Sequence, residues 1–432
     1  MGHQRVFRVS TPQARRMALD ILRRCLDHNQ DIQAATDDVL AVAPDGPDKG
    51  LATELAYGYL RLRGRLDFLL NQLLRNPVQT SPVLRRILGV AAYELLFLSR
   101  IPEYATLDWA VTLAKDRLDP TMGKVANGVL RSLLRLGRAV HHPDYFQTKT
   151  AGVAAFLAAW YSCPSWLARM WLSAYGQEQA ETLLRASLQT PPLGARINRL
   201  HPEANALRQQ LASTAEVREF EAALTQWPEF LHAAETNGVL TRQSLAAQRI
   251  MDVLGVDLWP DPILDACAGR GGKTFLMAER GKEVWAADVN VFRLGQFGAE
   301  CRRLGFAVPV FRAPAQGPSP LRQAPRTIFL DAPCSGLGVL SRRPDIKWKR
   351  TPADCATLAS LQRDMLAGAA GLLPGGGGLV YVTCTMNPAE NETQIASFIH
   401  DHPNFSLVRQ ARTPMSEHLG EFFFGAVLHK KN

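Results

Sequence analysis

The sequence predicts a multidomain protein with an all-α N-terminal part and an α/β C-terminal part. Three observations predict this fold class. The chain has 432 residues, which is enough for several domains of about 100–200 residues each. Apolar residues recur at helical spacing through the first 140 residues, with almost no alternating strand pattern. From Pro262 onward, short apolar runs alternate with helical stretches, which is typical of a parallel βαβ sheet.

Composition and charge narrow the class of protein. Hydrophobic residues make up 47% of the chain and charged residues 21%, which excludes wholesale disorder and a collagen-like repeat. Lys and Arg number 49 against 40 Asp and Glu, for a net charge of +9. The first 140 residues hold 20 Lys and Arg against 14 Asp and Glu, which is two thirds of that excess. This balance favours a polyanionic partner, with an ordinary solvated surface as the alternative interpretation.

Cysteine usage and hydropathy indicate the compartment. The seven cysteines are odd in number and form no CxxC pair, so neither a zinc site nor a disulfide framework is indicated. We therefore expect no metal and a reducing, cytoplasmic environment. The N-terminus lacks the apolar region of a signal peptide, and no apolar run reaches the roughly 18–20 residues of a membrane span. We expect no association with a membrane.

The first part, residues 1–140, should form a series of helices. Thr11 and Pro12 supply a capping residue and a proline at the first helical position. Further helices are expected at Leu51–Leu74 with breaks at Gly58 and Gly64, and at Pro82–Leu98, Thr106–Arg117 and Gly123–Leu136. Arginines cluster at positions 61–65, 85–86 and 131–138. These clusters are either solvated helix surface or a face that contacts phosphates.

The middle part, residues 141–240, is predicted to be a linker followed by a small α/β subdomain. Residues 141–165 have the composition of a linker, and a helix follows at Trp166–Gln189. A short strand is expected at Ala195–Asn198 and a helix at Ala204–Ala212. The last part, residues 241–432, carries the alternating strands and helices.

The first segment with recognisable chemistry is residues 263–281, where a buried strand ends in Asp265 and a glycine-rich turn leads into a helix near Lys273. Ligands bind at such strand-to-helix crossings. Cys267 stands where a nucleotide P-loop requires glycine, and the G-x-G-x-x-G pattern also fails. A looser loop that holds S-adenosylmethionine remains, with Asp288 about 20 residues later as an acceptor for ribose hydroxyls. A tight turn with a capping Asp is the alternative interpretation.

Two further strands end in cysteine-containing motifs. Asp331 and Cys334 follow the strand near residue 330, and Cys384 follows the strand near residue 380. Either cysteine alone is more often a small buried apolar residue than a nucleophile. Two of them at the carboxyl ends of two strands, on the ligand side of the sheet, favour a chemical role.

The reaction that suits two thiols and a carboxyl group is methylation at carbon 5 of a pyrimidine. Addition of a thiolate to carbon 6 makes carbon 5 nucleophilic, and a base must afterwards remove the proton from carbon 5 so that the thiolate can leave. A nearby carboxyl group would polarise the ring and select cytosine. The target base must be unpaired or flipped out.

Three motifs carry a resemblance to a known family. DACAGRGGKT, DAPCSGLG and VTCT resemble the motifs of the RNA (cytosine-5) methyltransferases of the Sun/Nop2 family, and the RRPDIKW run is most similar to its bacterial RsmB-like branch, which acts on small-subunit ribosomal RNA. The N-terminal helices are similar to the NusB fold. The resemblance implies a NusB-like RNA-binding domain at 1–140 and a Rossmann-like class I S-adenosylmethionine methyltransferase domain at 241–432.

The resemblance also implies roles for individual residues. Cys384 would be the nucleophile, Cys334 would assist release of the methylated base, Asp331 would orient the cytosine, and Lys273 would lie between cofactor and base. Spacing alone does not choose between the two cysteines. The expected cofactor-binding residues are Asp265, Ala266, Cys267, Ala268, Gly269, Gly271, Gly272, Lys273, Asp288 and Asp331. The expected RNA-binding residues are Arg196 and Asn198 of an RxN segment, together with Arg342, Arg343 and Lys347.

The sequence departs from the family pattern at three places. Gly269-Arg270 stands where the family loop has Ala-Pro, and Gln243-Ser244 where it often has Gln-Asp. The acid expected near the adenine after the third strand is absent from residues 311–315, so cofactor affinity could fall by roughly 1–3 kcal/mol.

The expected function is a cytoplasmic, monomeric methyltransferase that uses S-adenosylmethionine to form 5-methylcytosine in ribosomal RNA, with 16S rRNA as the preferred substrate. An RNA-binding protein with a decayed methyltransferase domain is the alternative, motivated by the missing acid. A thiol hydrolase lacks a histidine at a plausible triad position near either cysteine motif.

Overall fold

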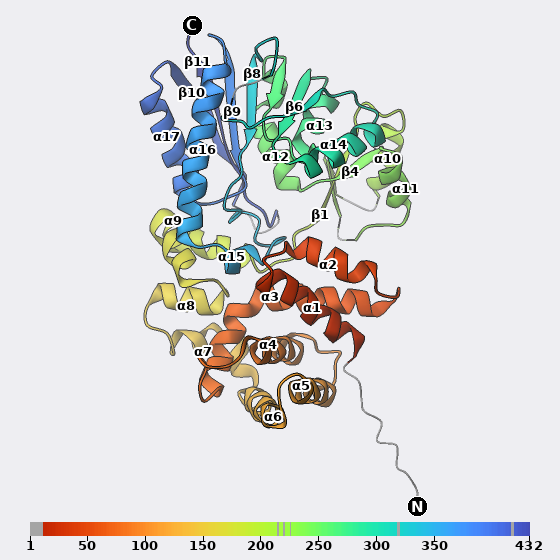
Figure 1. The fold of residues 1–432 in the computed structure, drawn as a ribbon, viewed down its shortest axis with the longest axis vertical. Helices are drawn as coiled ribbons and strands as arrows, with labels where there is room; N and C mark the ends of the chain where they lie inside the picture. Colours follow the sequence, from red (N-terminus) through yellow and green to blue (C-terminus); the bar gives the residue numbers. More distant parts are fainter. Residues whose placement is uncertain (1–11, 214–215, 219–220, 225, 318–319, 416–418) are drawn as a thin grey trace, which may run out of the picture. The chain divides into compact units, whose positions relative to one another are not determined.

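The computed structural model describes residues 12–432 except 214–215, 219–220, 225, 318–319 and 416–418 (Figure 1). The Thr11 cap and the N-terminal stretch on which the signal-peptide expectation rests lie outside these residues. The chain divides into two compact units. One comprises the residues up to Leu188 together with Arg343–Lys349, and the other comprises Gln189–Arg342 together with Arg350–Asn432. Within the described part of the chain, no helix combines the length and apolar character needed to cross a membrane.

The first unit is entirely helical in the residues described, and the helical prediction for residues 1–140 is confirmed over the described part of that range. Its helices are α1 (Gln13–Asp27), α2 (Ile32–Ala41), α3 (Pro47–Leu73), α4 (Pro82–Phe97), α5 (Glu103–Arg117), α6 (Pro120–Arg135), η1 (Gly137–His141), α7 (Pro143–Gln147), α8 (Val153–Trp160), α9 (Ser165–Ala186) and α15 (Ile346–Lys349). Helix α2 was not predicted, and the expected linker at 141–165 is largely helical. Helix α9 is kinked at Gly176, whose backbone is not helical.

The predicted breaks in α3 at Gly58 and Gly64 are wrong, because both glycines serve close packing rather than a turn. A Cβ atom at Gly58 would lie 2.1 Å from the ring of Tyr93, and one at Gly64 would lie 2.8 Å from the ring of Trp348. Absence of a side chain therefore lets two aromatic residues approach a continuous helix. The cost of glycine within a helix, roughly 1 kcal/mol relative to alanine, is offset by this burial.

The short segment Arg343–Lys349 packs with the helical unit although it is far from it in sequence. Trp348 Nε1 donates a hydrogen bond to the Leu60 carbonyl oxygen at 2.6 Å, and Lys347 Nζ donates to the Arg61 carbonyl oxygen at 2.9 Å. Lys349 Nζ donates to the Gln30 carbonyl oxygen at 2.6 Å. The chain thus leaves the second unit after Arg342 and returns to it at Arg350.

The second unit begins with a small antiparallel sheet. Its strands, in spatial order β2-β3-β1-β4, are β1 (Leu193–Ile197), β2 (Glu216–Arg218), β3 (Glu221–Leu224) and β4 (Leu240–Arg242). Helices α10 (Ala204–Leu211) and α11 (Phe230–Thr236) accompany it. Ala195 and Ile197 of β1 pack with Leu207 and Leu211 of α10, so this sheet has a hydrophobic cluster of its own. The predicted strand and the helix at 204–212 are confirmed.

A seven-stranded sheet forms the centre of the second unit. Its spatial order is β10-β11-β9-β8-β5-β6-β7. Strands β5 (Ile263–Asp265), β6 (Val284–Asp288), β7 (Val310–Arg312), β8 (Thr327–Asp331) and β9 (Gly378–Thr383) are parallel, while β10 (Phe405–Arg412) and β11 (Phe424–Lys430) pair antiparallel. The Rossmann-like prediction is confirmed.

Helices cover both faces of this sheet. They are α12 (Leu245–Val253), η2 (Val256–Leu258), α13 (Gly272–Glu279), α14 (Val291–Leu304), α16 (Pro352–Leu372), η3 (Pro388–Glu390) and α17 (Glu392–Asp401). Alternate residues of each strand face opposite layers: Leu330 packs with Leu366 of α16, whereas Phe329 packs with Ile250 of α12. The strand order reverses between β5 and β8, which is where ligands bind in open α/β sheets.

Candidate active site

The loop between β5 and α13 is built to bring its backbone close to a ligand. Gly269 and Gly271 have φ angles of 57° and 88°, in the left-handed region that favours glycine. A Cβ atom at Gly271 would also lie 2.2 Å from the ring of Phe275, so a larger residue does not fit there. The Gly269 N–H donates to Asp288 Oδ2 at 2.9 Å, which ties the loop to the end of β6.

Asp265 holds the two ends of this loop together through hydrogen bonds. It is buried and accepts hydrogen bonds from Thr274 Oγ1 at 2.6 Å and from the Cys267 N–H at 3.2 Å. Burial raises the pKa of Asp265 to about 7, and the two hydrogen bonds limit that rise. The predicted loop residues therefore share one hydrogen-bonded turn.

Lys273 and Asp331 meet across the strand order reversal. Lys273 lies in the first turn of α13, Asp331 ends β8, and Nζ and Oδ2 are 2.6 Å apart. Burial works against the charged form of Lys273, but the Asp331 carboxylate outweighs it, so the pKa of Lys273 is raised. The lysine is therefore cationic at neutral pH, and its charge fixes the Asp331 carboxylate at the mouth of the site.

The two predicted cysteines lie together. Cys334 Sγ and Cys384 Sγ are 3.2 Å apart, and the Cys384 N–H donates to Cys334 Sγ at 3.3 Å. The hydrogen bond between the thiols, with burial as the second cause, raises the pKa of Cys334 well above its ordinary value. Gly338 allows this arrangement, because a Cβ atom there would lie 2.9 Å from the Cys384 carbonyl oxygen.

A pocket of about 490 Å³ opens over the β5–α13 loop and the Lys273–Asp331 pair, and neither Cys334 nor Cys384 lines it. We call it the loop pocket. Nine of the ten residues predicted to bind the cofactor line it, and Gly271 is the exception. Ten further residues line the pocket, and none of them was predicted to bind the cofactor. They are Gln243, Ala247, Arg270, Val289, Arg293, Ala315, Gln316, Pro333, Leu361 and Met365.

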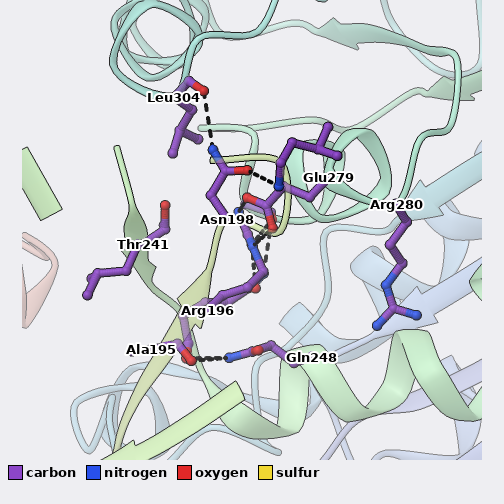
Figure 2. A network of polar contacts seen from close by, with 12 residues as sticks. Ala195, Arg196, Asn198, Thr241, Gln248, Glu279, Arg280 and Leu304 are labelled. Atoms are coloured by element: carbon purple, nitrogen blue, oxygen red, sulfur yellow. Dashed lines mark hydrogen bonds and ion pairs between the residues drawn. The ribbon is translucent and has the colours of Figure 1, made fainter. Parts of the chain in front are cut away.

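Arg196 and Asn198, which were predicted to bind RNA, do not lie at the surface of the structure. Arg196 is buried, and its guanidinium donates to both carboxylate oxygens of Glu279, at 2.8 and 3.0 Å (Figure 2). It also donates to the Gly272 carbonyl oxygen at 2.7 Å. Asn198 is buried as well and donates to the Leu304 carbonyl oxygen at 3.3 Å (Figure 2). Both residues therefore join the small sheet to the elements beside the loop pocket.

The three basic residues predicted after Gly338 differ in their surroundings. Lys347 is fully buried, which does not agree with its expected contact to RNA, and burial lowers its pKa to about 7. Arg342 is partly exposed and donates to Glu421 Oε1 at 3.0 Å. Arg343 is also partly exposed and forms an ion pair with Asp31 in the helical unit. Only the two arginines have side chains that solvent can reach.

Sequence reasoning missed the polar residues that lie around the two cysteines. Glu390, Gln362, Ser335 and Thr385 are buried and hydrogen-bonded to one another. The signal available in the sequence was the segment that opens the helix after Cys384, which contains Glu390. Its buried position depends on a fold contact with α16 that sequence spacing does not show.

In residues 12–432, apart from the short stretches left undescribed, no three His, Cys, Asp or Glu side chains are grouped so that they could hold a metal ion.

Family comparisons cover most of the chain. Residues 259–425 match the family described as 16S rRNA methyltransferase RsmB/F, residues 12–135 match the NusB family, and residues 163–230 match an RsmF/B-like ferredoxin-like domain. A probable ribosomal RNA small subunit methyltransferase B of Synechocystis sp. is 34% identical over 418 residues, which are 91% of this chain and 90% of the relative. A probable methyltransferase B of Bacillus subtilis is 32% identical and covers 83% of this chain and 81% of the relative.

Solved structures share the fold at lower identity. A crystal structure described as that of PH0851 superposes with a TM-score of 0.75 at 22% identity, and the match covers 98% of this chain and 100% of the other. NSun6 from Pyrococcus horikoshii with SFG gives a TM-score of 0.53 at 19% identity, covering 62% of this chain and 98% of the other.

Proposed function

The chain belongs to the family of ribosomal RNA small subunit methyltransferase B, and from that membership we propose that it forms 5-methylcytosine in small-subunit ribosomal RNA with S-adenosylmethionine as methyl donor. The observation that carries the proposal is the pair of thiols 3.2 Å apart, beside a carboxylate held by a lysine. Methylation at carbon 5 requires a nucleophile and a group that helps release the product, and this site supplies both.

The loop pocket fits the proposed methyl donor. Asp288 lies at the end of β6, where a carboxylate can accept ribose hydroxyls, and Gly269 lines the pocket without a side chain that would fill it. The acid that the family carries near the adenine is absent from residues 311–315 of this chain, and Ala315 and Gln316 line the pocket. When bound there, S-adenosylmethionine would supply a methyl group on a positively charged sulfur.

The surroundings of Cys334 argue against it as the nucleophile. The raised pKa of Cys334 keeps its thiol protonated at neutral pH, and a protonated thiol is a poor nucleophile. This supports Cys384 as the residue that adds to carbon 6 of the cytosine. Carbon 5 then becomes nucleophilic and takes up the methyl group.

Release reverses the addition. A base removes the proton from carbon 5, the electron pair of that C–H bond forms the C5–C6 double bond, and the C6–S bond breaks with its pair returning to Cys384. Cys334 is close enough to assist this step. The Asp331 carboxylate, held by Lys273, would orient the ring by accepting a hydrogen bond from its exocyclic amine.

The RNA would be bound largely through phosphates. The helical unit carries much of the positive excess. A hollow of about 470 Å³ beside α1, α4 and α5 has four arginines (Arg16, Arg23, Arg86 and Arg117) and one acid, Asp20, among its lining residues. Arg342 and Arg343 remain candidates for such contacts because both are partly exposed. We propose that the protein acts in the cytoplasm as a monomer.

The test is methyl transfer to small-subunit RNA by the purified protein. Cys384→Ala should abolish transfer, and Cys334→Ala should accumulate an RNA–protein adduct that survives denaturing electrophoresis. Bisulfite sequencing of ribosomal RNA from a deletion strain should show that one cytosine loses its methyl group. If no cytosine changes and calorimetry detects RNA binding without S-adenosylmethionine binding, the protein is an RNA-binding protein with a decayed methyltransferase domain.

A further inference from the structure

A buried carboxylate lies beside the loop that carries Cys334. Glu390, at the end of η3, has no exposed surface and accepts three hydrogen bonds. The donors are the Ser335 N–H at 2.8 Å, Gln362 Nε2 at 2.9 Å and Asn387 Nδ2 at 2.9 Å. None of these donors carries a charge. A buried carboxylate is costly unless its oxygens are satisfied, so this one is held by a complete set of directional contacts.

The same contacts hold both neighbours of Cys334 in the chain. Glu390 binds Ser335 through its N–H, and Gln362 Nε2 donates a second hydrogen bond to the Pro333 carbonyl oxygen at 2.9 Å. Gln362 projects from α16, which packs on the sheet. The backbone on each side of Cys334 is therefore tied to one carboxylate and one amide.

The neighbours of Cys384 belong to the same network. Ser335 Oγ and Thr385 Oγ1 are 2.7 Å apart. Asn391, next to Glu390, donates to the Thr385 carbonyl oxygen at 2.9 Å and accepts from Thr383 Oγ1 at 2.6 Å. The two cysteine-bearing loops are thus joined by contacts that do not involve either sulfur.

We propose that Glu390 is a positioning residue that sets the separation of Cys334 from Cys384 for release of the methylated base. This inference rests on the proposed function. Addition of Cys384 to the base and methyl uptake need only Cys384 and Asp331 in place, whereas release also needs Cys334 beside the C6–S bond. Loss of the Glu390 contacts frees the Ser335 side of the Cys334 loop and leaves three donors unsatisfied, so release is the step that suffers.

The experiment compares Glu390→Ala with Cys334→Ala, using the full-length protein, small-subunit RNA and radiolabelled S-adenosylmethionine. Glu390→Ala should lower multiple-turnover methylation by roughly tenfold to hundredfold. It should accumulate the covalent adduct while a single round of methyl uptake proceeds. The KM for S-adenosylmethionine should stay at the wild-type value, which separates this effect from general damage to the site.

A double variant tests whether Glu390 acts through Cys334. Adding Glu390→Ala to Cys334→Ala should lower turnover no further than Cys334→Ala alone. Full additivity of the two effects, or loss of adduct formation in Glu390→Ala, would overturn the proposal. If Glu390→Ala does not fold, two milder variants replace it. Gln362→Leu removes the hydrogen bonds to Pro333 and Glu390 but leaves those that Ser335 and Asn387 donate to Glu390. Glu390→Gln keeps the shape of the side chain and one acceptor oxygen. Both should accumulate adduct to an intermediate degree, and wild-type adduct levels in both would contradict the inference.

Glu392→Ala is the matched control. Glu392 is a carboxylate two residues away that pairs with Arg412 at the partly exposed start of α17, outside this network. It should turn over like the wild type. If the wild-type protein methylates the RNA and Glu390→Ala does so at the same rate without accumulating adduct, only this inference is refuted. Absence of methylation by the wild type would instead refute the proposed function.

Discussion

At the scale of single residues, the charge on Lys273 governs the geometry of the site. Its side chain is mostly buried, and its hydrogen bond to Asp331 is charge-assisted at 2.6 Å. We expect Lys273→Met to leave the Asp331 carboxylate without its partner and to lower kcat about 10- to 100-fold, the equivalent of roughly 1.5–3 kcal/mol. Steady-state methylation assays would measure this.

Lys282→Met provides a control for that substitution. Lys282 Nζ donates to the Trp259 carbonyl oxygen at 2.8 Å, and Lys282 does not line the loop pocket. Its kcat should stay within about twofold of the wild type, in line with the small effects of surface substitutions. Equal kcat values for Lys273→Met and the wild type would show that Lys273 has no role in the reaction.

At the scale of elements, the pair of Arg196 on β1 and Glu279 on α13 couples the small sheet to the helix that begins at the loop pocket. Arg196→Met should lower the free energy of unfolding by about 3–5 kcal/mol, because it leaves a buried carboxylate unpaired. The double variant Arg196→Met/Glu279→Met should recover most of that loss, since it removes both charges. Urea denaturation of the three proteins measures the difference.

The loss in Arg196→Met should depend on pH in a defined direction. Burial raises the pKa of Glu279, and Arg196 opposes that rise. Without Arg196, the folded state binds the Glu279 proton more tightly than the unfolded state does, so stability falls as pH rises above the ordinary pKa of 4.5. The variant should therefore lie closer to the wild type at pH 5 than at pH 8, and a constant difference would contradict this assignment.

The sequence predicts contacts between neighbouring elements better than contacts between residues that are far apart in the chain. The Asp265–Gly272 loop and the meeting of Cys334 with Cys384 were predictable, because a strand, its turn and the next helix are adjacent in sequence and parallel strands end at one edge. The pairing of Arg196 with Glu279 spans 83 positions, and no local pattern indicates it. RNA contact was expected for Arg196 from the resemblance of its RxN segment to the family, and the burial of its side chain depends on this same distant partner.

At the scale of the whole molecule, Lys347 ties stability to pH. Burial lowers its pKa from the ordinary 10.5 to about 7, so between these values the unfolded chain holds the proton and the folded chain does not. Its contribution to the free energy of unfolding therefore decreases as pH falls from about 10.5 to about 7 and is constant below that. Lys347→Met should raise the melting temperature at pH 7.

The free energy of unfolding at pH 7 should rise by about 1–3 kcal/mol in this variant. Removal of the buried amine stabilises the folded state, and loss of the hydrogen bond to the Arg61 carbonyl oxygen offsets part of that gain. The difference between variant and wild type should shrink as pH approaches 10. Thermal unfolding at pH 7, 8.5 and 10 checks this, with Lys431→Met as a control because Lys431 is exposed near the C-terminus. A difference that is the same at all three pH values would contradict the burial of a neutral lysine.

The path of Arg343–Lys349 has a consequence for dissecting the protein. A truncation that begins at Gln189 would keep these seven residues but lose the carbonyl groups of Leu60, Arg61 and Gln30 that they bind. In that truncated protein, the indole of Trp348 would lose its packing against Gly64. The helical unit expressed alone would have a cavity where Trp348 packs in the whole protein. A single cut in the chain therefore cannot separate the two units with all of their residues. A separate peptide of residues 343–349 should stabilise the isolated helical unit.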